Sequence, residues 1–237
     1  MGVNKRHVAS KNETASDLAI KAAERLFAKG EVARDEIDYV LFCTQSPDYF
    51  LPTSACIIQD KLGLRRNIGA LDFNLGCSGY VYGLSLAKGL ISCGVANSVL
   101  LLTGETYNKH LHPKDKGNRT IFGDAASATV ISTNGISEIG DFSLGTDGSG
   151  ADNLIVRSGG MRIPEKRCDL SFDENNNPVS SDYLYMNGAE IFTFTLDNVP
   201  PLIDDVLSKN GLAKDDIDLY VFHQANNCLL YTSPSPR

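Results

Sequence analysis

Apolar residues along the chain switch repeatedly between helical and strand spacing. Residues 14–29 carry apolar side chains three or four positions apart and stop at Gly30, a pattern typical of an amphipathic helix. The same spacing predicts further helices and strands. The helices are expected at 53–63, 78–93 and about 190–209, and the strands at 37–44, 68–75, 98–105 and 127–132. Such alternation favours a mixed α/β sheet with helices packed on its faces.

Two segments that lie 180 residues apart resemble each other. "ARDEIDYVLFCTQ" (33–45) and "AKDDIDLYVFHQA" (213–225) are identical at five positions, and a helical segment precedes each of them. One interpretation is chance, because this helix–strand connection is common; the other is an internally duplicated fold. The second copy stops soon after its strand, and the tail from about 228 is rich in serine and proline. We therefore expect the second half to be incomplete and this tail not to be native.

Composition narrows the class of protein. The net charge is −7 and no basic stripe appears, which argues against a nucleic-acid partner. The longest apolar stretches are too short to span a bilayer and no signal-peptide pattern opens the chain, so we expect no membrane contact and a cytoplasmic protein. The six cysteines form no C-x-x-C pair, and among the four histidines only His110 and His112 lie close together. The sequence therefore predicts no metal site.

The stretch "NLGCSGYVYGL" (74–84) places a cysteine where a predicted strand gives way to a helix. A helix N-terminus carries positive charge and unpaired N–H groups, which favour a thiolate at Cys77 and can hold an oxyanion. Gly76 is expected to allow a sharp turn, and Gly79 to leave room for a substrate. The helix is apolar nearly all round, which predicts that it is buried, with Cys77 at the base of a pocket. The alternative is a small core residue, as we expect for Cys56.

A second reactive side chain is predicted at the end of the repeated strand. His223 follows "LYVF" in the second copy, and strand ends in α/β sheets are where sites are assembled. It is a candidate base or hydrogen-bond donor for Cys77. By itself it is better explained as a core histidine whose hydrogen bonds are satisfied, and its pairing with Cys77 in a duplicated fold favours the functional interpretation.

Several blocks together resemble the β-ketoacyl-acyl-carrier-protein synthase III family of thiolase-like condensing enzymes. They are "LDFNLGCSGYVYGLSLAKGLI" around Cys77, "IFGDAASATVIS", "DGSGADNL", "YLYMNGAEIFTFTL" and "HQANN". The resemblance implies a duplicated five-layered α-β-α-β-α sandwich, in agreement with the internal repeat. It divides the chain into an N-terminal half, 1–135, with the cysteine, and an incomplete C-terminal half, 136–237, with the histidine.

The resemblance also implies roles for particular residues. Cys77 and His223 match two of the family's three catalytic residues, and the third, an asparagine, belongs to a segment beyond this chain. The segment 49–52 matches a loop that one subunit of a homodimer contributes to the acyl pocket of the other. The basic residues of "DKGNRT" match the coenzyme A entrance, although a solvated loop would also explain them. The substrate-binding residues expected in this way are Leu51, Lys116, Arg119 and Asn226.

By the same resemblance, Cys77 takes an acyl group from an acyl-coenzyme A and then condenses it with malonyl-acyl-carrier protein, which starts fatty acid synthesis without a cofactor. Several alternatives stay open: a related Cys-His-Asn acyltransferase of specialised metabolism, an inactive fragment that only binds partners, and a cysteine hydrolase. Hydroxymethylglutaryl-coenzyme A synthase ranks lower, because "FCTQSPDYF" lacks the glutamate of that family.

Overall fold

The computed structural model describes residues 5–135 and 137–223, which fall into two compact units. The sheet unit comprises residues 7–107 and 123–139. The α4 unit comprises the remaining described residues, 5–6, 108–122 and 140–223. The domain boundary expected at residue 135 stays a prediction.

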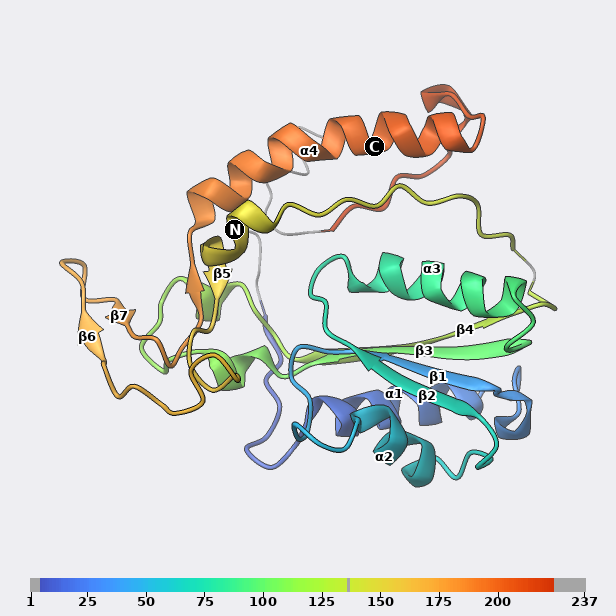
Figure 1. Ribbon diagram of the computed structural model, residues 1–237, viewed down its shortest axis with the longest axis horizontal. Helices are drawn as coiled ribbons and strands as arrows, with labels where there is room; N and C mark the ends of the chain where they lie inside the picture. Colours follow the sequence, from blue (N-terminus) through green and yellow to red (C-terminus); the bar gives the residue numbers. More distant parts are fainter. Residues whose placement is uncertain (1–4, 136, 224–237) are drawn as a thin grey trace. The chain divides into compact units, whose positions relative to one another are not determined.

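One four-stranded sheet organises the sheet unit, in the order β2-β1-β3-β4 (Figure 1). Its strands are β1 (Tyr39–Cys43), β2 (Gly69–Phe73), β3 (Ser98–Glu105) and β4 (Ala125–Ser132). β1 pairs in parallel with β2 and β3, and β4 pairs antiparallel with β3. The two inner strands are covered on both faces, which explains their nearly continuous apolar runs. All four strands were predicted to within two residues at each end.

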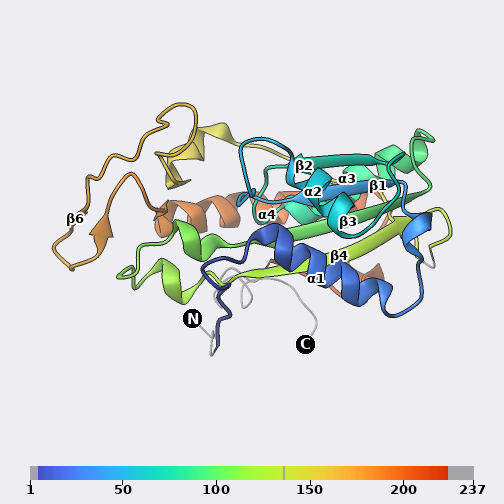
Figure 2. The same ribbon diagram turned by 90° about the horizontal axis from the view of Figure 1, so that it is seen from below.

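Helices cover both faces of this sheet (Figures 1 and 2). They are α1 (Ala15–Phe27), α2 (Ser54–Lys61) and α3 (Gly79–Ser92), again within two residues of the prediction. α1 and α2 pack on one face, where Val40 and Phe42 of β1 are fully buried. α3 packs on the other face, against Leu41 of β1 and Leu101 of β3. The sheet unit thus has three layers, and the predicted α/β class is confirmed.

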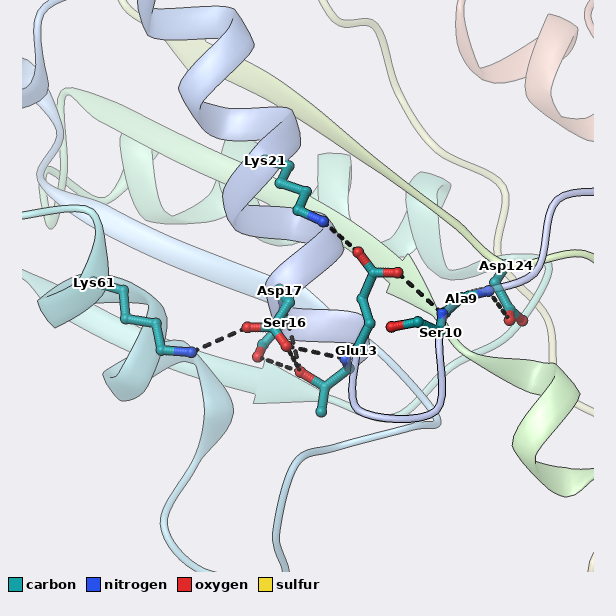
Figure 3. Close-up of polar contacts among 9 residues, drawn as sticks. Ala9, Ser10, Glu13, Ser16, Asp17, Lys21, Lys61 and Asp124 are labelled. Atoms are coloured by element: carbon teal, nitrogen blue, oxygen red, sulfur yellow. Dashed lines mark hydrogen bonds and ion pairs between the residues drawn. The ribbon is translucent and has the colours of Figure 1, made fainter.

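The N-terminus of α1 shows why that helix begins where it does (Figure 3). The Thr14 hydroxyl accepts a hydrogen bond from the backbone N–H of Asp17 at 3.3 Å, and the Asp17 carboxylate accepts one from the Thr14 N–H at 3.1 Å. This reciprocal capping box satisfies two backbone donors. Asp17 also forms an ion pair with Lys61 of α2 at 3.1 Å, which links the two helices on this face.

The α4 unit contains one long helix and two small sheets. α4 runs from Gly188 to Lys209, as predicted, and includes Pro200 and Pro201. The strands pair antiparallel, β5 with β8 and β6 with β7. Their bounds are β5 (Leu154–Ile155), β6 (Ser171–Phe172), β7 (Pro178–Val179) and β8 (Tyr185–Met186). The short 3-10 helices of the two units are η1 (Arg34–Glu36), η2 (Tyr107–His110), η3 (Asn118–Thr120), η4 (Gly148–Asn153) and η5 (Lys214–Asp216).

The internal repeat is preserved in its turn but not in its strand. η1 and η5 are built alike: the backbone N–H of the residue before each helix donates to a carboxylate three residues later, at 2.7 Å in η1 and 2.8 Å in η5. After η1 the chain enters β1, whose backbone pairs on both sides. After η5, residues 217–223 form no strand, and Leu219 and Val221 are 68% and 85% exposed. The predicted strand before His223 is therefore wrong within the described residues.

Candidate active site

Cys77 lies between β2 and α3, directly before the N-cap residue Ser78. Its side chain is exposed, and the Ser78 side chain makes no capping hydrogen bond. The positive end of the helix dipole and the N–H groups of the first turn therefore lie close to Cys77 in the chain. Both stabilise a thiolate, and the N–H groups can stabilise an oxyanion formed when that thiolate attacks a carbonyl. The structure thus puts Cys77 where a nucleophile is favoured.

The glycines beside Cys77 serve close packing. A Cβ added to Gly79 would lie 2.2 Å from Cys43 Sγ, and one added to Gly76 would lie 2.8 Å from Gln45 Oε1. Neither glycine has a positive φ. The sharp turn expected at Gly76 is present, since the Gly79 backbone N–H donates to the Gly76 carbonyl oxygen at 2.8 Å. The space expected at Gly79 is instead filled by the Cys43 side chain, which ends β1.

α3 is buried along one stripe only. Its buried residues are Gly79, Gly83 and Ala87, which recur every four positions and face the sheet. Val81, on the opposite side, is 45% exposed, and Tyr80, at the edge of the buried stripe, is 42% exposed. The prediction of a helix buried all round, with Cys77 at the base of a pocket, is therefore wrong for the described residues. Apolar residues on every side made the helix look like a core element, although only small residues are fully buried and Leu84, Leu90 and Ile91 are partly buried beside them.

A polar cluster lies next to Cys77. Glu105 ends β3, and its carboxylate accepts hydrogen bonds from the Gln45 backbone N–H at 2.6 Å and the Ser46 hydroxyl at 2.8 Å. The Gln45 side chain accepts a hydrogen bond from the Tyr107 hydroxyl. Burial raises the pKa of Glu105 to about 7 and moves the pKa of Tyr107 above its usual range, with the charges of Glu105 and Cys77 adding to the shift at Tyr107. The Tyr107 hydroxyl therefore stays protonated and can donate.

Sequence reasoning missed this cluster. Gln45 follows β1, Glu105 ends β3 and Tyr107 begins η2, so sheet pairing brings together side chains about 60 residues apart in the sequence. The available signal was the glutamate in "LLTGET": an acidic residue that ends a buried apolar strand stands where parallel strands end together.

Lys116 and Arg119, the residues expected at the coenzyme A entrance, line the same surface cavity of the α4 unit. The cavity has a volume of about 410 Å³, and Arg6 and Lys114 also line it. Asp115 is the acidic residue in its wall, and its carboxylate is engaged by the backbone and side-chain N–H groups of Asn118, each at 2.8 Å. The cavity is thus lined by four positively charged side chains and by one carboxylate that is already hydrogen-bonded to Asn118. This excess of positive charge makes the cavity suited to an anionic group such as a phosphate.

The loop containing Leu51 exposes three consecutive apolar residues. Tyr49, Phe50 and Leu51 are 64%, 73% and 86% exposed. The loop is fixed just before them, since Asp48 accepts a hydrogen bond from the Ser16 hydroxyl at 2.6 Å and donates its backbone N–H to Ser54 Oγ at 3.1 Å. A contiguous apolar patch on a held loop is typical of an interaction surface.

The remaining candidate residues lie elsewhere. His223 is exposed and belongs to the α4 unit, whereas Cys77 belongs to the sheet unit. Asn226 lies outside the described residues. Within the described part of the chain, no three His, Cys, Asp or Glu side chains gather as a metal site would require, and no helix has the length and apolarity needed to cross a bilayer.

Comparisons with known proteins converge on one family. The family model for 3-oxoacyl-[acyl-carrier-protein (ACP)] synthase III matches residues 71–148, which include Cys77. A beta-ketoacyl-[acyl-carrier-protein] synthase III of Clostridium perfringens is 36% identical over 226 residues, which cover 95% of this chain and 67% of that protein. The chain thus spans about two thirds of the length of this relative.

Solved structures agree with the sequence match. A crystal structure of a 3-oxoacyl-(acyl-carrier-protein) synthase III superposes with a TM-score of 0.93 at 51% identity, covering 97% of this chain and 69% of the other. A priming beta-ketosynthase from the R1128 polyketide biosynthetic pathway superposes with a TM-score of 0.82 at 27% identity, covering 97% and 66%.

Proposed function

The chain belongs to the β-ketoacyl-[acyl-carrier-protein] synthase III family of thiolase-like condensing enzymes, and on this premise we propose that it starts fatty acid synthesis through an acyl-enzyme at Cys77. The family fixes the reaction class as acyl transfer with carbon–carbon bond formation. The position of Cys77 at the N-terminus of α3 is the observation that carries the assignment of the nucleophile.

In the first stage the Cys77 thiolate attacks the carbonyl carbon of an acyl-coenzyme A thioester. A new carbon–sulfur bond forms to Cys77, the bond to the coenzyme A sulfur breaks, and coenzyme A leaves as a thiolate that takes up a proton. N–H groups at the start of α3 are suited to stabilise the oxyanion of the tetrahedral intermediate. Covalent catalysis divides the condensation into two easier steps.

In the second stage malonyl-acyl-carrier protein loses carbon dioxide. The electron pair of the broken carbon–carbon bond forms an enolate on the thioester, and we assign His223 to donate a hydrogen bond to its oxygen. The enolate carbon attacks the acyl group on Cys77 and releases the thiolate, which gives a 3-ketoacyl product on the carrier protein. Both stages involve thioesters and side chains only, so the proposal includes no cofactor.

Coenzyme A recognition is assigned to the cationic cavity of the α4 unit. Arg6, Lys114, Lys116 and Arg119 surround about 410 Å³, and coenzyme A carries phosphates that such a cluster attracts. Arg119 is held in place because its guanidinium donates to the Pro113 carbonyl oxygen. Lys116 is exposed and can reach a bound phosphate.

We propose further that the enzyme is a homodimer in which the patch Tyr49–Phe50–Leu51 enters the partner's acyl pocket. The exposure of these three side chains supports this, because burial of such a patch is favourable. A cytoplasmic location is also part of the proposal. It is supported by Cys43, Cys56, Cys93 and Cys168, which are not joined in disulfides, since thiols persist in a reducing compartment.

A condensation assay tests the proposed function. The protein is mixed with acetyl-coenzyme A and malonyl-acyl-carrier protein, and the carrier protein is weighed by mass spectrometry. We expect a 3-ketoacyl product with the wild type and none with Cys77→Ser. Release of free acid without malonyl-carrier protein would instead identify a hydrolase, and no reaction of any kind would indicate a binding protein.

An acyltransferase of specialised metabolism is the second candidate. The structural likeness to a priming ketosynthase of a polyketide pathway supports it, at 27% identity against 51% for a synthase III. The higher identity favours fatty acid initiation. Parallel assays with carrier proteins of the two kinds decide between them, because the true partner should give the higher kcat/KM.

A further inference from the structure

The carboxylate of Glu105 holds the turn that follows β1. It accepts hydrogen bonds from two consecutive residues, the Gln45 backbone N–H at 2.6 Å and the Ser46 hydroxyl at 2.8 Å. The Ser46 hydroxyl oxygen in turn accepts a longer bond from the Thr106 N–H at 3.4 Å. These bonds join the end of β3 to the end of β1 and fix where the Gln45 side chain begins.

From that turn, the Gln45 side chain reaches the backbone next to Cys77. Its oxygen accepts a hydrogen bond from the Tyr107 hydroxyl. A Cβ on Gly76 would lie 2.8 Å from this oxygen and 3.9 Å from the Tyr107 hydroxyl, so the Gln45–Tyr107 pair rests against the residue that precedes Cys77. Glu105 thus connects to the Cys77 segment through one turn and one side-chain pair.

The surroundings of Glu105 favour protonation of its carboxylate. The titratable groups that face it are Asp124 before β4, Tyr107 after β3 and Cys43 at the end of β1. None of these three is a cation. Burial raises the pKa of Glu105 to about 7, the negative Asp124 adds to the shift, and the bonds from Gln45 and Ser46 oppose it. The carboxyl group therefore changes charge near neutral pH.

We propose that Glu105 is a positioning residue for the nucleophile, which sets the Gln45–Tyr107 pair against Gly76 and so fixes the backbone at Cys77. The inference rests on the proposed function, because it takes Cys77 to be the residue that is acylated. Glu105 itself touches no reacting atom in this scheme. The proposal explains why a carboxylate is kept in a largely buried place where none of the described titratable groups that face it is a cation.

Protonation has a defined consequence. An ionised carboxylate accepts both bonds strongly, whereas a protonated one must use one oxygen as a donor and loses an acceptor. The turn is then held less firmly and the Gln45–Tyr107 pair shifts away from Gly76. Because small misplacements at a reacting centre slow a reaction strongly, by up to roughly a hundredfold, acylation of Cys77 should slow as the pH falls through 7.

The test compares wild-type protein with Glu105→Gln, whose side chain has the same shape and no charge. The rate of Cys77 acylation by acetyl-coenzyme A is followed by mass spectrometry from pH 5.5 to 8.5. The ratio of the two rates cancels the ionisation of Cys77, which both proteins share. We expect the wild-type rate divided by the Glu105→Gln rate to stay near one below pH 6. Above pH 8 this ratio should reach about ten or more, with the midpoint of the rise near pH 7.

Glu36→Gln is the matched control. Glu36 also accepts a hydrogen bond from a backbone N–H, that of Ala33 at 2.7 Å, but at the opposite end of β1. The acylation rate of wild type divided by that of Glu36→Gln should therefore not change with pH. A flat ratio for Glu105→Gln would overturn the positioning role while leaving the proposed function intact. If wild-type Cys77 takes no acyl group at any pH, the proposed function is wrong and the inference falls with it.

Ser46→Ala provides a second variant in case Glu105→Gln does not fold. It removes one bond to the carboxylate and leaves the carboxyl group in place. Because that bond lowers the pKa of Glu105, its loss should move the midpoint of the acylation profile to higher pH. A midpoint that does not move would contradict the proposal.

Discussion

The described cysteines differ in environment more than in exposure. Cys56, Cys77, Cys93 and Cys168 are all exposed, so access to solvent does not distinguish the candidate nucleophile. Cys77 alone among these four lies directly before the N-cap of a helix of 14 residues, where the thiolate is stabilised. Cys43 is the opposite case: burial raises the pKa of its thiol to about 11, and it donates to the Leu75 carbonyl oxygen.

The order in which the cysteines are alkylated should reflect these environments. With limiting iodoacetamide at pH 7, Cys77 should be modified first, by about tenfold or more over Cys56 and Cys93, because the thiolate is the reacting form. Cys43 should react last and only after unfolding. Peptide mapping by mass spectrometry measures the order. Equal labelling of the exposed cysteines would show that the helix N-terminus does not activate Cys77.

Ionisation of Glu105 should also make the free energy of unfolding depend on pH. Its folded pKa of about 7 lies above the reference value of 4.5, so the folded protein holds a proton that the unfolded chain has lost between these pH values. The contribution of this group to the free energy of unfolding is greatest below about pH 4.5 and is lost as the pH rises through 7.

Urea unfolding at pH 5 and pH 8 checks that sign. The wild type should lose more stability over this interval than Glu105→Gln, by on the order of 1–3 kcal/mol, since one pKa unit corresponds to about 1.4 kcal/mol. The other titrating groups are common to both proteins and cancel. An equal loss in the two proteins would mean that Glu105 titrates normally.

The helices and strands of the sheet unit could be predicted because their signals are local. Periodicity and caps placed every end of β1 to β4 and α1 to α3 within two residues. The strand expected before His223 was not found, because a strand also needs partners. β1 pairs on both sides, and its repeat finds no such pairing among the described residues. The position of Glu105 at a strand end was a usable signal, but its partners could not be predicted, since only the sheet register brings Gln45 to it.

α3 gives a paired test of close packing. A Cβ on Gly83 would lie 2.5 Å and 2.9 Å from the methyl carbons of Leu101 and 3.2 Å from the Phe73 ring, whereas one on Gly89 would meet nothing within 4 Å. Gly83→Ala should therefore destabilise the protein by about 1–3 kcal/mol through overpacking. Gly89→Ala should stabilise it by about 0.5–1 kcal/mol through helix propensity. Chemical unfolding measures both, and destabilisation by both variants would contradict the packing of α3 on the sheet.

Exposed apolar surface links the fold to assembly. The patch Tyr49–Phe50–Leu51 and the outer side of α3 both lie in the sheet unit and remain exposed in the described chain. Stable dimers bury on the order of 800 Å² per partner, and a continuous apolar patch on a fixed loop is suited to the centre of such an interface. Local sequence could suggest this surface, but only the structure showed how fully Leu51 is exposed.

Leu51→Trp tests whether that side chain lines the partner's acyl pocket. A larger side chain should shorten the pocket, so activity with long acyl-coenzyme A should fall at least about tenfold more than activity with acetyl-coenzyme A. Val95→Trp is the control, because Val95 is also an exposed apolar residue of the sheet unit. It should change neither the activity with long acyl-coenzyme A nor that with acetyl-coenzyme A. Steady-state kinetics across chain lengths gives the answer. Equal losses with all chain lengths would indicate misfolding, and no loss would remove Leu51 from the pocket.

The identity of the acylated residue is the most informative single result. The protein is mixed with acetyl-coenzyme A, quenched in acid, digested and mapped by mass spectrometry. An acetyl group on the peptide that contains Cys77, absent from Cys77→Ser, is the result predicted by the position of this residue at the start of α3. An acetyl group on another cysteine, with Cys77 unmodified, would contradict it.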